Sequence, residues 1–193
     1  MKRRPLFQFV LLLSLALACA CGGGGGASTS NTSGSSDSSS GSGPTSTNTW
    51  VGKLADSSGF IAIMKEGTVH LIYVTDGDKL FVWFEGDASG AVAGYFTFYN
   101  DEGGSIINNP TADGFGGTVT VGPGQHYRYT VVPARGEAGL YRAKETTAGE
   151  TWESGWIVLN DGSVRGARKS SAGKVEGLAT RGGVKWTDPG AAP

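Results

Sequence analysis

The sequence predicts an all-β protein, an antiparallel meander of about 8–12 short strands. A small β-barrel is the favoured architecture, and a two-layer sandwich is the alternative. After Trp50 no stretch keeps the apolar period of an amphipathic helix. Short runs of β-branched and aromatic residues recur instead, each closed by Gly, Asn or Asp. The connections between these runs are too short for parallel crossovers, so neighbouring strands are expected to be antiparallel.

The first part of the chain has the pattern of an export signal. Lys2, Arg3 and Arg4 precede an apolar run over residues 6–18, which is too short to span a bilayer. A basic start, a short apolar run and small residues before a boundary are typical of a cleavable signal peptide. We therefore assign residues 1–21 to a signal segment.

Two cysteines end this segment, and their surroundings resemble a bacterial lipobox. In a lipobox, small residues precede a cysteine that is acylated and becomes the new N-terminus. Cys21 is the predicted lipid attachment site because the glycine run 22–26 begins directly after it, and Cys19 is the alternative. The resemblance implies a palmitate-bearing lipoprotein in the cell envelope, exposed to the periplasm or outside the cell. An ordinary secretory signal cleaved nearby is the competing interpretation.

Residues 22–49 consist mostly of Gly, Ser and Thr, with Asp37 as their single charge. Such a composition cannot offset the entropy lost on ordering the chain. We therefore expect a disordered tether, with a reach of roughly 30 Å, that holds the following domain off a membrane. The β-domain is assigned to residues 50–182 and a C-terminal tail to residues 183–193.

The β-domain divides into strand-forming runs separated by turns. The predicted strands lie near residues 50–55, 59–65, 68–75, 79–85, 92–99, 104–108, 114–121, 126–132, 138–146, 151–159, 163–169 and 174–180. Residues 76–78 (Asp-Gly-Asp) and 160–162 (Asn-Asp-Gly) have the composition of tight hairpin turns, in which Gly supplies a positive φ.

Alternation along the strands indicates that both faces of the first part are buried. Phe81 and Trp83 fall on one side of their strand, whereas Val82 and Phe84 fall on the other. A sheet with one solvated side does not have this pattern. Two packed layers explain it, and so does a closed barrel that is partly covered outside.

Several segments resemble an uncharacterised domain of exported bacterial proteins, over about residues 50–168. They are residues 50–52 (WVG), 60–63 (FIAI), 73–77 (YVTDG), 139–142 (GLYR) and 155–162 (GWIVLNDG). The resemblance implies an exported β-domain and brings no mechanism with it.

Charge and cysteine content exclude some function classes. The formal net charge is −1, and the chain after the basic leader is more acidic still, which argues against nucleic-acid binding. Both cysteines lie in the leader, so the domain has no disulfide and no Cys-ligated metal site.

A basic excess gathers late in the chain and is interpreted as a solvated face or a contact with anionic envelope polymers. Its members are Arg165, Arg168, Lys169, Lys174, Arg181 and Lys185.

Catalytic and metal-binding patterns are weak. His70 and His126 lie in different predicted strands, and neither has a second His or Cys at ligand spacing. The chain has no G-x-S-x-G motif. The acids of residues 76–78 and 101–102 are expected to be solvated turn residues rather than calcium ligands. The sequence therefore predicts no enzyme activity, no cofactor and no metal.

The aromatic residues supply the remaining functional signal. Trp83, Tyr95, Tyr99 and Trp156 are the candidate ligand-binding residues, because such rings bind sugars or apolar ligands when they line a cavity. Core packing is the competing interpretation.

We predict a monomeric, membrane-tethered binding or envelope-interaction module, with an envelope polymer or protein as its partner. A lipocalin-like carrier of a small apolar ligand and an envelope hydrolase are the alternatives.

Overall fold

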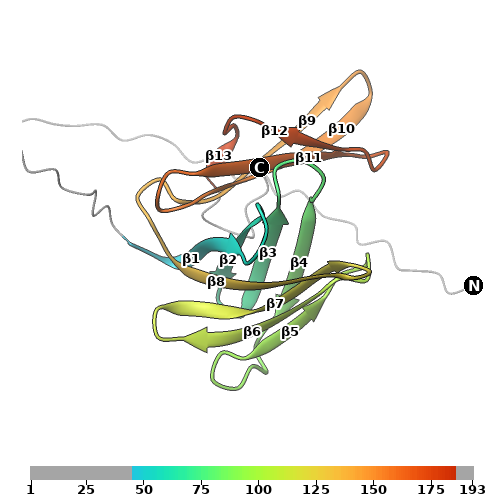
Figure 1. Ribbon diagram of the computed structural model, residues 1–193. Coiled ribbons are helices and arrows are strands. Elements are labelled where there is room, and N and C mark those ends of the chain that lie inside the picture. The colour runs from blue at the N-terminus through green and yellow to red at the C-terminus, as the bar shows by residue number, and fades with distance from the viewer. Residues whose placement is uncertain (1–44, 186–193) are drawn as a thin grey trace, which may run out of the picture. The chain divides into compact units, whose positions relative to one another are not determined.

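The computed structural model of the chain describes residues 45–185, which form thirteen strands in two antiparallel sheets. Within this range there is no helix that could cross a membrane. Twelve of the thirteen strands overlap the twelve predicted ones, with some ends shifted by three to five residues, and the last was not predicted (Figure 1). They are β1 (Thr45–Leu54), β2 (Phe60–Glu66), β3 (Val69–Thr75), β4 (Val82–Asp87), β5 (Phe96–Tyr99), β6 (Ser105–Thr111), β7 (Gly114–Gly122), β8 (Gln125–Arg135), β9 (Gly139–Thr147), β10 (Glu150–Val158), β11 (Val164–Ser170), β12 (Val175–Leu178) and β13 (Val184–Lys185).

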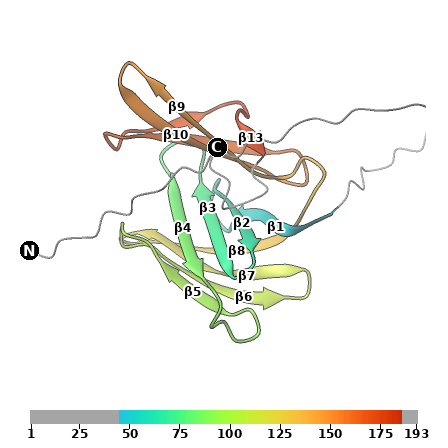
Figure 2. The same ribbon diagram turned by 180° about the vertical axis from the view of Figure 1, so that it is seen from behind.

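The first sheet has eight strands in the order β4-β3-β2-β1-β8-β7-β6-β5 and is nearly closed as a barrel (Figures 1 and 2). Two meanders, β1–β4 and β5–β8, are joined where β1 pairs with β8. In this pairing Val51 lies opposite Val132. The predicted meander is therefore interrupted by one long-range pairing, which brings the two halves into one sheet.

Side chains close the gap between β4 and β5, the two edges of this sheet. A Cβ on Gly86 would lie 2.4 Å from Cδ1 of Phe98, so the ring of Phe98 packs directly on the backbone of β4. Asn100 Nδ2 donates a hydrogen bond to the carbonyl of Trp83 over 3.3 Å. The ring of Phe98 and the side-chain amide of Asn100 thus connect the two edge strands.

The interior of the barrel is filled by buried apolar side chains from all eight strands. Successive residues of a strand point to opposite faces, so every second side chain enters this cluster. Its members are Leu54, Ile61, Ile63, Ile72, Val74, Val82, Phe84, Phe96, Phe98, Ile106, Val119, Tyr129 and Val131.

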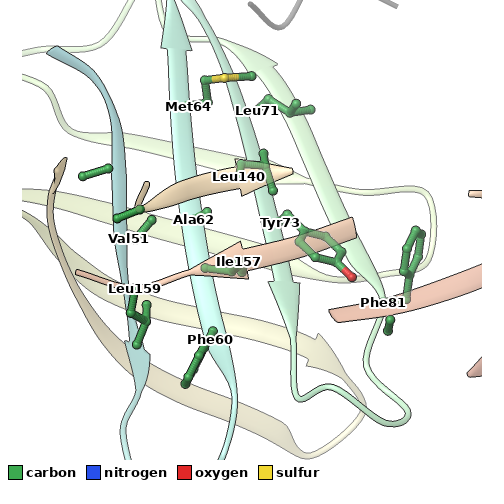
Figure 3. Close-up of a cluster of buried hydrophobic side chains, with 13 residues drawn as sticks. Val51, Phe60, Ala62, Met64, Leu71, Tyr73, Phe81, Leu140, Ile157 and Leu159 are labelled. Atoms are coloured by element: carbon green, nitrogen blue, oxygen red, sulfur yellow. The ribbon is translucent and has the colours of Figure 1, made fainter. Parts of the chain in front are cut away.

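The second sheet has the strand order β12-β11-β10-β9-β13 and packs on the outer face of the first meander. Figure 3 shows this contact, with Ala62 and Tyr73 on one side and Leu140 and Ile157 on the other. One face of β2 and β3 enters the barrel and the other meets the second sheet, which explains the predicted burial of both faces there. For β5 this prediction is wrong, because its outward residues Thr97 and Tyr99 are exposed. The buried residues between the sheets are Val51, Phe60, Ala62, Met64, Leu71, Tyr73, Phe81, Ala134, Ala138, Leu140, Ile157, Leu159 and Ala167.

The ends of the β-structure differ from the predicted boundaries. β1 begins at Thr45, inside the predicted tether, because the chain there pairs with β8 at Arg135. At the other end β13 lies in the predicted tail and pairs with β9. The signal segment, both cysteines and the tether up to residue 44 lie outside the described residues.

Candidate functional site

A groove of about 630 Å³ opens between the barrel and the second sheet. The barrel contributes β4, the end of β5 and the turn between β5 and β6, and the second sheet contributes β9, β10 and β11. Aromatic, acidic and basic side chains line it together, among them Trp83, Tyr99, Glu102, Lys144, Glu153 and Lys169.

The floor of the groove is a packed aromatic group. Trp83 stacks on Tyr73, with ring centroids 4.3 Å apart and planes 27° from parallel. Phe81 meets Tyr73 edge to face, with centroids 5.3 Å apart. The buried hydroxyl of Tyr73 donates to the carbonyl of Gly155 in the second sheet over 3.3 Å. Burial raises the pKa of Tyr73 far above its usual range, so the phenol stays protonated even in alkaline solution.

Glu153, which lines the groove from the second sheet, belongs to an ion pair. Arg142 and Glu153 lie on the paired strands β9 and β10 and form a salt bridge. The guanidinium carbon of Arg142 also lies 5.5 Å from the ring centroid of Trp83, within the range of a cation–π contact. Arg142 therefore links Glu153 to the aromatic floor.

A second ion pair crosses the groove from sheet to sheet. Lys169 on β11 binds the carboxylate of Glu102 in the β5–β6 turn. That turn is held by Asn100, whose Oδ1 accepts hydrogen bonds from the backbone N–H groups of Glu102 and Gly104 at 3.2 and 2.6 Å. The position of Glu102 thus follows from the turn chemistry of Asn100.

The structure brings together two of the four aromatic residues predicted to bind a ligand. Trp83 is half-buried in the floor, and Tyr99 stands at the mouth with 75% of its surface exposed. Tyr95 is also exposed but lies just before β5, outside the groove lining. Trp156 is buried on the far face of the second sheet, where its Nε1 donates to the carbonyl of Thr180 over 2.8 Å.

Sequence reasoning did not select Arg142, Glu153 or Lys169 for this groove. They come from three different strands, and Glu102 joins them from a turn in the other sheet. No local spacing links such residues. Arg142 is the last residue of the GLYR segment (residues 139–142). That segment was the one local sequence feature that drew attention to Arg142.

The late basic residues are largely paired with acids. The guanidinium of Arg168 lies 2.6 Å from Glu176 and 4.2 Å from the ring centroid of Trp152. This pairing reduces the positive charge available to an anionic polymer. The pairs are Arg168 with Glu176 and Glu145, Lys169 with Glu102, Lys174 with Glu176, and Arg181 with Glu137.

Asp76 has a structural role in the β3–β4 turn. Its Oδ1 accepts hydrogen bonds at 2.9 Å from the backbone N–H groups of Asp78, Lys79 and Leu80. Burial acts to raise the pKa of this carboxyl, but the backbone donors outweigh it and lower the pKa below its usual value. Within residues 45–185, no group of three or more His, Cys, Asp and Glu side chains is arranged to hold a metal ion.

The two histidines lie apart from each other and from the groove lining. His70 is buried at one end of the barrel, 4.7 Å from Phe96 between ring centroids, and its Nδ1 lies 3.2 Å from the carbonyl of Thr68. His126 is exposed on β8, with its Nδ1 2.8 Å from the hydroxyl of Thr120.

Comparisons of the chain with protein families, with curated proteins and with solved structures each found no match.

Proposed function

We propose that this protein is an exported, lipid-anchored binding module whose groove between the two sheets binds an uncharged glycan of the cell envelope. The observation that carries this proposal is the meeting of Trp83 and Tyr99 with the two ion pairs in one open groove. The C–H face of a sugar ring packs on an aromatic ring, and its hydroxyls need donors and acceptors around it. The groove supplies both kinds of contact.

The filled barrel favours the groove over the interior as the binding site. A lipocalin-like carrier holds its ligand inside the barrel, where this chain has buried side chains from all eight strands. An apolar ligand in the groove would have to cover Glu102, Lys169 and Glu153, and covering charged groups without new partners is unfavourable. A ligand rich in hydroxyls replaces the lost water contacts.

The balance of charge favours an uncharged ligand. The groove lining has four acids and two lysines, and Arg142 lies beside it. Glu102 and Glu153 already have cationic partners within the protein. An anionic polymer would meet the excess of carboxylates, whereas an uncharged glycan avoids this repulsion.

We propose binding rather than hydrolysis as the activity of this groove. Hydrolysis of a glycan needs two carboxyl groups that are able to act as acid, base or nucleophile. Of the four acids in the lining, Glu153 and Glu102 are engaged by Arg142 and Lys169. Glu85 and Asp101 remain, and the hydrolysis assay below tests them. The lipid on Cys21 and the tether of residues 22–44 would then hold the domain within reach of glycan strands next to the membrane.

Calorimetric titration of the full-length lipoprotein in detergent with N,N′-diacetylchitobiose (called chitobiose below), an uncharged disaccharide, tests the proposal. We expect saturable binding, and Tyr99→Ala should weaken it by about tenfold, the effect expected of losing one aromatic contact. Tyr99 is so exposed that this change should leave the fold intact. Trp83→Phe provides a second groove variant, and Val132→Ala on β8 is the matched control because Val132 is exposed outside the groove.

The absence of saturable binding, or equal affinity in the wild type and Tyr99→Ala, would contradict the proposal. Conversion of hexa-N-acetylchitohexaose (called chitohexaose below) into shorter products would show a hydrolase instead.

A further inference from the structure

The outer face of β5 and β6, with the loop that precedes β5, carries an unusual set of exposed apolar side chains. Val92, Tyr95, Tyr99 and Ile107 have 78, 55, 75 and 49% of their surfaces exposed. Among the described residues six large hydrophobic side chains are exposed, and these four are among them. A concentration of this kind on a monomeric domain is typical of a binding surface.

Strand register arranges this face in rows. Thr97 on β5 lies opposite Ile107 on β6, and Ile107 lies opposite Thr118 on β7. In the next row Tyr99 lies opposite Ser105. The inward residues between them, such as Phe98, belong to the barrel core, so the outward ones form a separate surface.

The members of these rows are uncharged. Their side chains end in hydroxyl groups, aromatic rings or an aliphatic group, and the second row continues from Ser105 to Thr120. Arg128, opposite Thr118 on β8, marks the margin of the face. An anionic bilayer attracts lysine and arginine, so the chemistry of this face suits an uncharged hydroxyl-rich polymer better than a membrane.

Tyr99 belongs to both surfaces. It lines the mouth of the groove and also stands on the outer face of β5. Tyr95 precedes it by four residues, a distance of about 13 Å along an extended strand. The groove therefore continues, through Tyr99, onto a strip formed by Tyr99, Ile107 and Tyr95, which we call the aromatic strip.

Resting on the proposed function, we infer that the ligand is a linear, uncharged oligosaccharide or polysaccharide, which starts in the groove and extends along the aromatic strip. The groove takes the first sugar rings, and Tyr95 and Ile107 contact later ones. Contacts to successive parts of one chain reinforce each other, because the second contact is made at high effective concentration. Affinity should then rise with chain length.

The dependence of affinity on chain length tests this inference. For the full-length lipoprotein in detergent, we expect chitohexaose to bind about tenfold or more tightly than chitobiose. Tyr95→Ala should leave the affinity for chitobiose unchanged and remove most of the preference for chitohexaose. Ile107→Ser should act in the same direction, and Val132→Ala is again the exposed control.

Two sets of outcomes distinguish this inference from the proposed function. If Tyr99→Ala weakens chitobiose binding but Tyr95→Ala leaves the length preference intact, the groove stands and the aromatic strip is excluded. If the wild type binds neither sugar, the proposed function fails and the inference with it. If Tyr95→Ala instead reduces binding to vesicles of anionic lipid, or changes a dimer into a monomer, the strip contacts a membrane or a second copy and the inference is overturned.

Discussion

The hydroxyl of Tyr73 and the carbonyl of Gly155 join the two sheets by a hydrogen bond of 3.3 Å beneath the groove. Tyr73 supports Trp83 by ring stacking. A Cβ on Gly155 would lie only 2.7 Å from Cζ of Tyr73, so this close approach requires glycine. The position of the groove floor therefore depends on Gly155, which is not itself among the lining residues of the groove.

Gly155→Ala should destabilise the protein by about 1–3 kcal/mol, the usual effect of forcing an extra carbon into a packed core. Chemical denaturation measures the change. Gly90→Ala is the matched control, because a Cβ there meets no atom within 4 Å. Equal stability of the two variants would mean that the sheets do not approach as closely as the Tyr73–Gly155 contact requires.

A strained turn offers a stabilising change. Ala148 and Gly149 connect β9 to β10 with φ values of 53° and 82°. Two positive φ values in a two-residue hairpin loop are typical of a turn that prefers Asn-Gly. Ala148→Asn should raise the free energy of unfolding by about 0.5–1 kcal/mol, because alanine is disfavoured in this region. Thermal unfolding measures the change. Ala112→Asn is the control, because Ala112 is exposed and does not have a positive φ. A loss of stability in Ala148→Asn would contradict the turn geometry.

His70 should make stability depend on pH. Burial lowers its pKa below the ordinary value of 6.5, so the folded protein resists a proton that the unfolded chain accepts. Stability is therefore full above about pH 6.5 and falls as the pH decreases. In His70→Gln the fall between about pH 7 and pH 5 should be shallower than in the wild type. His126→Gln, at an exposed position, is the control, and identical pH profiles for His70→Gln and the wild type would refute the role of His70.

The strands and turns were predictable because their signals are local. Gly162 in the Asn-Asp-Gly turn has the positive φ of 80° that its position requires, and β10 and β11 flank it as expected. The candidate site was only partly predictable because its residues meet through long-range contacts. Trp83 and Trp156 both lie in strands with the same alternating pattern. The packing of the two sheets places Trp83 in the groove, whereas the chain near Thr180 covers Trp156.

The lipid anchor is tested by changing one cysteine at a time. Cys21→Ala should abolish labelling with palmitate and release the protein from the membrane fraction, since the tether itself has no apolar segment to hold it there. Cys19→Ala should retain both properties. The reverse pattern would assign the lipid to Cys19, and full membrane retention in both variants would exclude the lipoprotein proposal.

The most direct test of glycan binding in the groove is the indole N–H resonance of Trp83 during titration with chitobiose, recorded by nuclear magnetic resonance. Trp83 lines the groove, whereas Trp156 is buried on the far face of the second sheet. Binding in the groove should shift the Trp83 resonance in a saturable way and leave the Trp156 resonance unchanged. A shift confined to Trp156, or no shift at saturating sugar, would contradict it.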